Sequence, residues 1–123
     1  MHKSRLGCLV IDCRTTDLTD AAAFWGATLG GPVTIDAEGK YAEVAVPDGE
    51  VKVLLQAVDH DSRVHLDIET DDIPAEVARL EGLGARRLAA IKGWVVMEAP
   101  TGHRFCIVKP QRPDFARNAA VRG

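Results

Sequence analysis

The sequence repeats one pattern of structural signals twice, and this repeat limits the folds that the chain can adopt. Asp17-Leu18 is matched by Asp72-Ile73, Leu29-Gly30 by Leu83-Gly84, and Pro47-Asp48-Gly49 by Pro100-Thr101-Gly102. The offset between matched positions changes only from 55 through 54 to 53 residues. Two halves with so similar a layout predict a duplicated structural unit.

The first half predicts a strand, a helix and three further strands. Residues 6–13 alternate as a strand does, and Asp17 can cap the helix that follows. Gly30 and Gly31 end this helix, because glycine readily adopts the left-handed conformation. Its apolar positions recur at spacings of three and four residues, and they are Leu18, Ala22, Trp25 and Leu29. Strands are expected at residues 33–36, 41–46 and 51–57.

The second half predicts the same order of elements. Residues 63–69 form a strand, and Asp71-Asp72 begins a helix with Pro74 in its first turn. The apolar side of this helix holds Ile73, Val77 and Leu80. Strands are expected at residues 86–90, 94–99 and 104–108. The modules therefore span residues 6–57 and 63–109, and residues 111–123 are expected to form a tail.

Composition restricts the class of protein. A chain of 123 residues with 46% hydrophobic and 27% charged residues has the size and make-up of one soluble domain. The net charge of −3 includes no basic stripe, which argues against nucleic-acid binding. No apolar run approaches the ~20 residues that span a membrane, so a cytoplasmic protein is expected. The three cysteines show no CxxC spacing, which argues against a zinc knuckle.

The main functional signal is a difference between the two first strands. Val10 and Asp12 in the first module correspond to His65 and Asp67 in the second. Residues two apart in a strand share a face, so His65 and Asp67 are expected side by side. Histidine titrates near neutral pH and suits both ligand binding and proton transfer. The alternative is a histidine that a neighbouring side chain satisfies.

The two βαβββ modules resemble the vicinal oxygen chelate superfamily, which includes glyoxalase I, bleomycin-resistance proteins and extradiol dioxygenases. The resemblance covers residues 6 to 110 and is greatest to the glyoxalase-like domain branch. Its motifs here are Val10-Ile11-Asp12-Cys13, Ala23-Phe24-Trp25, His65-Leu66-Asp67 and Gly102-His103-Arg104-Phe105-Cys106. It implies an α+β fold in which two tandem βαβββ modules form cupped mixed sheets around a central cavity.

In metal-dependent members of the superfamily, the first and fourth strands of each module supply the metal ligands. The resemblance places these positions at Val10, Val53, His65 and Cys106. Valine cannot bind a metal, and a catalytic zinc site normally has three protein ligands, so no metal cofactor is expected. Asp12 and Asp67 would lie ~7 Å further along their strands. A divalent metal held by such unusual ligands remains the alternative.

The expected ligand cavity combines polar and apolar side chains. His65 and Cys106 are also the candidates for catalysis, as a general base and a thiolate nucleophile. For Tyr41 and Trp94 the alternative is packing in the core, and for Cys106 it is an unreactive buried thiol. Trp25 is assigned to the core, and His60 and His103 to the surface. The expected lining residues are His65, Asp67, Asp12, Cys106, Val10, Val53, Trp94 and Tyr41.

These residues predict a protein that binds a small organic molecule without a complete metal site. One alternative is an enzyme, either a metal-dependent lyase, isomerase or dioxygenase, or a metal-free acid/base enzyme that uses His65. Another is an accessory interaction domain whose cavity is filled by core side chains. The resemblance also implies a homodimer.

Overall fold

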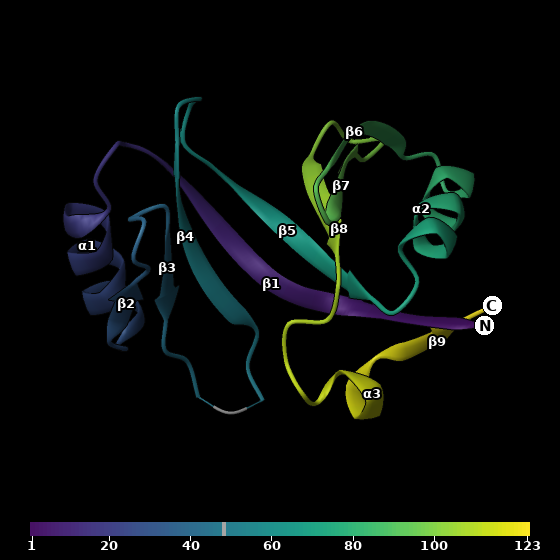
Figure 1. Ribbon diagram of the computed structural model, residues 1–123, viewed down its shortest axis with the longest axis horizontal. Helices are drawn as coiled ribbons and strands as arrows, with labels where there is room; N and C mark the ends of the chain where they lie inside the picture. The colour runs from purple at the N-terminus through teal and green to yellow at the C-terminus, as the bar shows by residue number, and fades with distance from the viewer. Residues whose placement is uncertain (48) are drawn as a thin grey trace. The chain divides into compact units, whose positions relative to one another are not determined.

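The computed structural model describes residues 1–47 and 49–123, and Asp48, in the first predicted Pro-x-Gly turn, lies outside them. These residues form a mixed α+β structure (Figure 1). Its elements are β1 (His2–Arg14), α1 (Thr19–Leu29), β2 (Val33–Ile35), β3 (Tyr41–Val44), β4 (Lys52–Val58), β5 (Arg63–Thr70), α2 (Ile73–Gly82), β6 (Arg86–Ile91), β7 (Trp94–Glu98), β8 (Arg104–Val108), α3 (Phe115–Asn118) and β9 (Ala120–Arg122).

Within residues 8–65 the described strands follow the order β2-β3-β4-β1, and in the rest of the described chain they follow the order β5-β8-β7-β6, with β9 paired to the start of β1. The α+β class and the two βαβββ repeats are as predicted. The chain divides into two compact units, residues 8–65 and residues 1–7 with 66–123. None of the described helices is long and apolar enough to cross a membrane.

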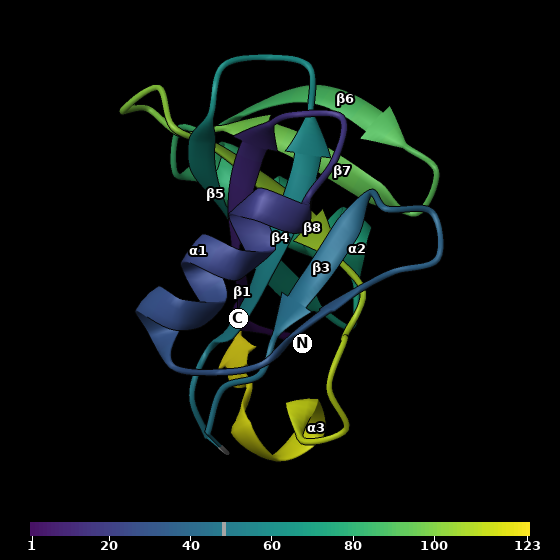
Figure 2. The same cartoon turned by 90° about the vertical axis from the view of Figure 1, so that its left-hand side faces the viewer.

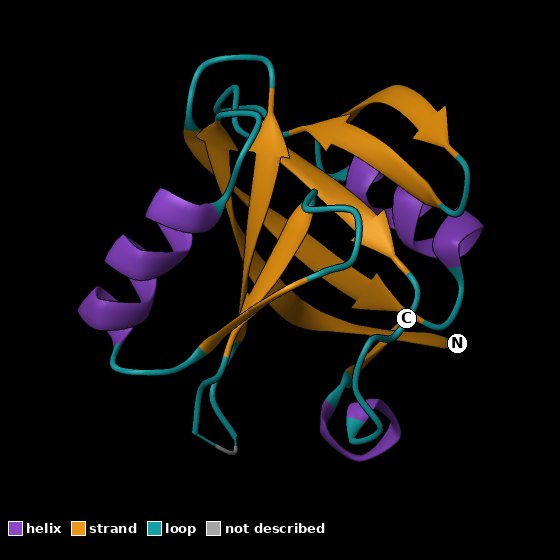
Figure 3. Ribbon diagram, turned by 60° about the vertical axis from the view of Figure 1, so that its left-hand side comes forward, coloured by secondary structure: helices purple, strands orange, loops and turns teal. Residues whose placement is uncertain are grey.

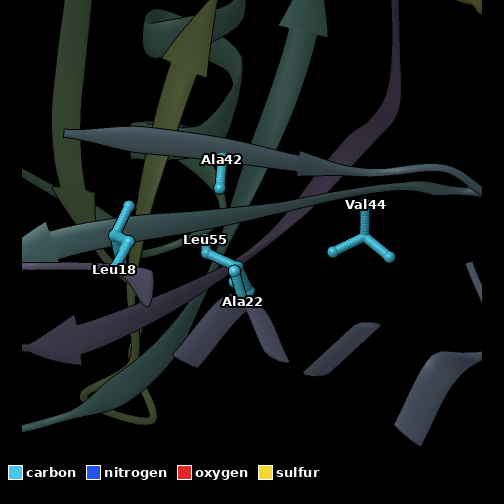
Figure 4. Close-up of a cluster of buried hydrophobic side chains, with 5 residues drawn as sticks. All are labelled: Leu18, Ala22, Ala42, Val44 and Leu55. Atoms are coloured by element: carbon cyan, nitrogen blue, oxygen red, sulfur yellow. The ribbon is translucent and has the colours of Figure 1, made fainter. Parts of the chain in front are cut away.

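In the unit of residues 8–65, β4 joins β1 in parallel and β3 in antiparallel pairing, and β2 extends the sheet beside β3. Helix α1 lies against one face of these strands (Figure 2). Apolar side chains fill the contact because alternate strand positions face the helix. Figure 4 shows this core, which consists of Leu18, Ala22, Ala42, Val44 and Leu55.

Helix α1 ends at the predicted glycine, but its N-cap is Leu18, one residue after the predicted Asp17, and the Leu18 side chain makes no capping hydrogen bond. Asp17 Oδ1 accepts hydrogen bonds from the backbone N–H and the hydroxyl of Thr19, at 2.9 and 2.7 Å. Gly30 has φ 78°, the left-handed conformation that stops the helix. Trp25 packs against the core as predicted. Leu29 is 45% exposed and lies outside the buried stripe to which its spacing assigned it.

In the other unit, β8 pairs in parallel with β5 and antiparallel with β7, and β6 follows β7. Asp72 caps α2 by accepting a hydrogen bond from the Ala75 N–H at 3.0 Å. Figure 3 shows the helices and the strands in separate colours. The core beneath α2 contains Val77, Val95, Met97 and Ile107, with Ile73 and Leu80 packed against it.

The predicted tail at 111–123 contains α3 and β9. Strand β9 pairs antiparallel with the start of β1, where His2 lies opposite Arg122, so the two ends of the chain lie together (Figure 1). Arg5 links them further through 2.8 Å ion pairs to Glu69 and Asp114. Strand β1 consequently begins at His2, four residues before the predicted start.

Candidate functional site

The two faces of β1 have different roles. Ile11 and Cys13 pack against the core beneath α1, so the alternation of a strand directs Val10 and Asp12 to the opposite face. In the parallel register, Val10 lies opposite Leu54 and Asp12 opposite Gln56. The face of the sheet away from α1 therefore changes from apolar at Val10 to polar at Asp12.

Val53 does not share this face. It lies opposite Leu9 and packs against the core beneath α1, so the prediction that it lines the site with Val10 is wrong. The cause is the length of the turn before the strand. Strand β4 begins at Lys52, three residues after Gly49, whereas β8 begins at Arg104, only two residues after Gly102. The residues four positions after these glycines are Val53 and Cys106. Val53 therefore faces the helix of its unit, whereas Cys106 faces away from the helix of its own.

Asp12 and His65 form the centre of the polar face. His65 Nδ1 lies 2.9 Å from Asp12 Oδ2. Both side chains are sheltered, with 3% of Asp12 and 13% of His65 exposed. Since a carboxylate accepts hydrogen bonds, this contact places the proton of a neutral His65 ring on Nδ1 and the lone pair on Nε2. Asp12 thus fixes the orientation and the tautomer of the histidine.

Two further side chains surround the Asp12 carboxylate. Arg63 Nε and His60 Nε2 lie 3.8 and 3.9 Å from Asp12 Oδ2, beyond hydrogen-bond distance. An Arg63 N–H donates to His60 Nε2 at 3.3 Å, and His60 Nδ1 lies 2.8 Å from the Asp61 carbonyl oxygen. In these contacts His60 Nε2 acts as the acceptor for Arg63, and His60 Nδ1 acts as the donor to the Asp61 carbonyl oxygen.

Asp12 Oδ1 is buried, and among the described residues it has no hydrogen-bond partner. Such an acceptor is costly in a protein interior. Asp12 also has an effect on the opposite face, because burial and the nearby Asp12 charge together raise the pKa of the Cys13 thiol. Cys13 is therefore a neutral thiol.

Tyr41 and Gln56 continue the polar face on the neighbouring strands. They are register partners, and the Gln56 amide donates to the Tyr41 hydroxyl at 3.3 Å. The sequence pattern did not single out Gln56 or the contact of His60 with Asp12. Gln56 could have been found as the polar position within the apolar strand 53–58. Trp94 lies opposite Ile91 at the start of β7, in the other unit.

The strand pair β5 and β8 brings three of the predicted residues together. Asp67 lies opposite Cys106, while Phe105 and Ile107 belong to the core beneath α2. The ligand atoms of His65, Asp67 and Cys106 all lie within 4.8 Å of one another. Their side chains converge although His65 and Asp67 are separated along β5, so the two-residue displacement does not exclude Asp67 as a ligand.

This cluster fits a divalent metal in its chemistry. Imidazole, carboxylate and thiolate are the three ligand types of protein zinc sites, and three such ligands leave a fourth position open. The Asp12 contact with His65 Nδ1 resembles the outer hydrogen bond of many zinc-bound histidines, which presents Nε2 to the metal. The thiolate makes the set less suited to magnesium or calcium, which prefer oxygen ligands.

Comparison with known proteins agrees with this fold. The family model described as glyoxalase-like domain matches residues 8–108. A hypothetical protein from Bacillus halodurans C-125 superposes with a TM-score of 0.66 at 12% identity, over 89% of this chain and 96% of that one. A search of curated proteins found no match.

Two solved structures with assigned activities have the same fold. Catechol 2,3-dioxygenase superposes with a TM-score of 0.60 at 18% identity, over 90% of this chain and 40% of that one. An NAD-dependent benzaldehyde dehydrogenase from Legionella pneumophila gives a TM-score of 0.60 at 11% identity, over 84% of this chain and 99% of that one. At these identities the likeness concerns the fold alone.

Proposed function

Because the chain belongs to the glyoxalase-like domain family, within the vicinal oxygen chelate superfamily, we propose that it binds a small organic molecule at the polar face around Asp12 and His65. The observation that carries this proposal is the 2.9 Å contact between the Asp12 carboxylate and His65 Nδ1. Burying a carboxylate costs free energy unless the carboxylate is paired, and here Asp12 is paired with an imidazole that it orients.

The surroundings of Asp12 support a role in ligand binding. Oδ1 lacks a hydrogen-bond partner among the described residues, and the neighbouring contacts of Oδ2 with His60 and Arg63 are long. These long contacts can be exchanged at low cost for hydrogen bonds to a ligand. A molecule that carries a hydroxyl or an N–H group would donate a hydrogen bond to this acceptor.

His65 would act as the polar anchor of the ligand. With Nδ1 directed to Asp12, Nε2 is the basic nitrogen, and it can accept a hydrogen bond or a proton. The same arrangement supports acid/base catalysis when the bound molecule has an acidic C–H or O–H bond.

A metal-dependent lyase, isomerase or dioxygenase is the second candidate, and the cluster of His65, Asp67 and Cys106 favours it. A divalent metal held there would polarise an oxygen of the substrate as a Lewis acid. His65 would then contribute as an oriented ligand, with Asp12 behind it. The two candidates differ in whether ligand binding requires the metal.

A thermal-shift screen against hydroxylated, aromatic and thiol-conjugated metabolites tests the proposal. It is run after chelation and again with added zinc. A ligand at 100 times its Kd should raise the stability by about 2.7 kcal/mol. The proposal expects a shift in chelated protein that His65→Ala removes and His103→Ala, at an exposed turn histidine, retains. A shift that appears only with zinc favours the second candidate, and a shift that survives His65→Ala contradicts both.

A further inference from the structure

A pocket of about 650 Å³ opens in the unit of residues 8–65, at the ends of β1 and β4. These strands are parallel, with Arg14 opposite Val58, so the segments that follow them lie at the same edge of the sheet. The carboxyl ends of parallel strands are a common place for ligands. The lining residues are Arg14, Thr15, Thr16, Lys40, Gln56, Ala57, Val58, Asp59 and His60.

The charge of this pocket differs from that of the whole chain. Arg14 and Lys40 supply two cations against the single carboxylate of Asp59. The chain as a whole has a net charge of −3. Hydroxyl and amide groups of Thr15, Thr16 and Gln56 add hydrogen-bonding capacity. An anion is therefore the kind of ligand that this edge attracts.

The contacts of Arg14 allow a ligand to replace the carboxylate that is paired with its guanidinium. Its guanidinium lies 2.8 Å from Asp61, but the two side chains are 63% and 95% exposed, and such surface pairs contribute little stability. The backbone of Arg14 is fixed separately, because its N–H donates to Ser62 Oγ at 3.0 Å. The carboxylate of a ligand can thus replace Asp61 on the guanidinium, in a paired hydrogen-bond geometry, without moving the strand.

Two residues that line the pocket also neighbour Asp12 on the polar face described above. His60 lines it and lies 3.9 Å from Asp12, and Gln56 lines it and is the register partner of Asp12. We propose that the pocket binds the acid group of a small organic anion, held by Arg14 and Lys40, while the rest of the molecule extends past Gln56 and His60 toward Asp12 and His65. This inference rests on the proposed function and names the chemical class of its ligand.

A nuclear magnetic resonance titration of the 15N-labelled protein tests the inference. The probes are succinate, inorganic phosphate and the neutral succinamide. Succinate should shift the amide signals of residues 14–16 and 57–60 saturably, whereas succinamide should not. Saturation by phosphate alone would identify the acid group as a phosphoryl group. Absence of saturable shifts with both anions, or equal shifts with succinamide, would overturn the inference.

Matched variants separate a site from a general effect of ions. Arg14→Gln and Lys40→Gln should each weaken succinate binding about tenfold, since each removes a charge-assisted contact. Arg86→Gln is the control, because Arg86 is also exposed and also pairs with a carboxylate, that of Glu98 at 2.7 Å, outside the pocket. Equal weakening in this control would show a nonspecific effect and overturn the inference.

The His65→Ala variant distinguishes the two proposals. It should retain succinate binding at Arg14 while it loses the ligands found by the metabolite screen. Saturable binding of succinate together with an empty metabolite screen would support the anion pocket and count against the wider function. Metabolite binding that Arg14→Gln and Lys40→Gln leave unchanged would support the function and overturn the anion pocket.

Discussion

Asp12 Oδ2 lies 2.9 Å from His65 Nδ1, although the two residues are 53 positions apart in the sequence. Because the carboxylate accepts a hydrogen bond from Nδ1–H, a neutral His65 should hold the Nδ1–H tautomer. Asp12→Asn removes the charge that favours this form, so the Nε2–H tautomer should become populated. Long-range 1H–15N spectra of the imidazole report the tautomer directly. Asp20→Asn, on the exposed side of α1, is the control, and an unchanged tautomer in Asp12→Asn would contradict the orienting role.

Cobalt binding should report the cluster of His65, Asp67 and Cys106. A cobalt ion bound there should produce the charge-transfer absorption of a cobalt–thiolate bond, and Cys106→Ser should abolish it. Cys13→Ser should leave it unchanged, because Cys13 packs against the core beneath α1. Asp67→Asn should weaken the binding about tenfold if the carboxylate is a ligand. Absorption that survives Cys106→Ser would exclude the cluster as its source.

Gly7 should tolerate no side chain. A Cβ at this position would lie 2.6 Å from Cδ of Glu69 and closer still to its Cγ. Glu69 is fully buried and cannot swing away, because it is bound to Arg5 and to the Gln111 N–H. Gly7→Ala should therefore lower the unfolding free energy by about 1–3 kcal/mol in urea denaturation.

The matched control for Gly7 is Gly82→Ala at the end of α2, where a Cβ would have no described atom within 4 Å. This change should be neutral or stabilise the helix by up to about 1 kcal/mol. Equal losses in both variants would refute the steric explanation.

Glu76 should make stability depend on pH in the acid range. Burial alone would raise its pKa, but hydrogen bonds from Arg79, His2 and Ser4 outweigh burial and lower the pKa to about 2. A lowered carboxyl pKa stabilises the fold above the ordinary value of 4.5, and this contribution is lost as the pH falls from about 5 to about 2. The loss should reach about 3 kcal/mol.

Denaturant unfolding between pH 7 and 2 measures this contribution. Glu76→Gln should be less stable than the wild type at pH 7 and should approach it near pH 2, since Glu76 is losing its charge in that range. Glu81→Gln, at an exposed position of the same helix, should follow the wild-type curve. Parallel curves for the wild type and Glu76→Gln would disprove the assigned role.

The local signals predicted most of the fold because each acts over a few residues. Asp72 caps α2 and Gly30 ends α1 as expected, and the matched helix starts, helix stops and Pro-x-Gly turns identified the repeat. The face on which each strand residue lies was harder to predict. The turn before β4 is one residue longer than the turn before β8, and this difference moves Val53 to the core face. Strand β9 was missed because its partner on β1 lies at the other end of the chain.

The candidate site was predicted in part. Strand periodicity placed His65 beside Asp67, and the structure brings Cys106 to them. The contacts of Asp12 with His65, Arg63 and His60 depend on tertiary structure. The pocket at Arg14 and Lys40 depends on which loops meet at one sheet edge, and no motif in the sequence encodes that meeting.

The pairing of β1 with β9 sets an order for folding during synthesis. Residues 8–65 form one unit from a continuous stretch of chain, so the contacts within this unit need no residue after position 65. Ser4 must wait for Arg122, which donates to its hydroxyl across 118 positions of sequence. Residues 2–4 therefore reach their native contacts only after residues 120–122 have been added to the chain.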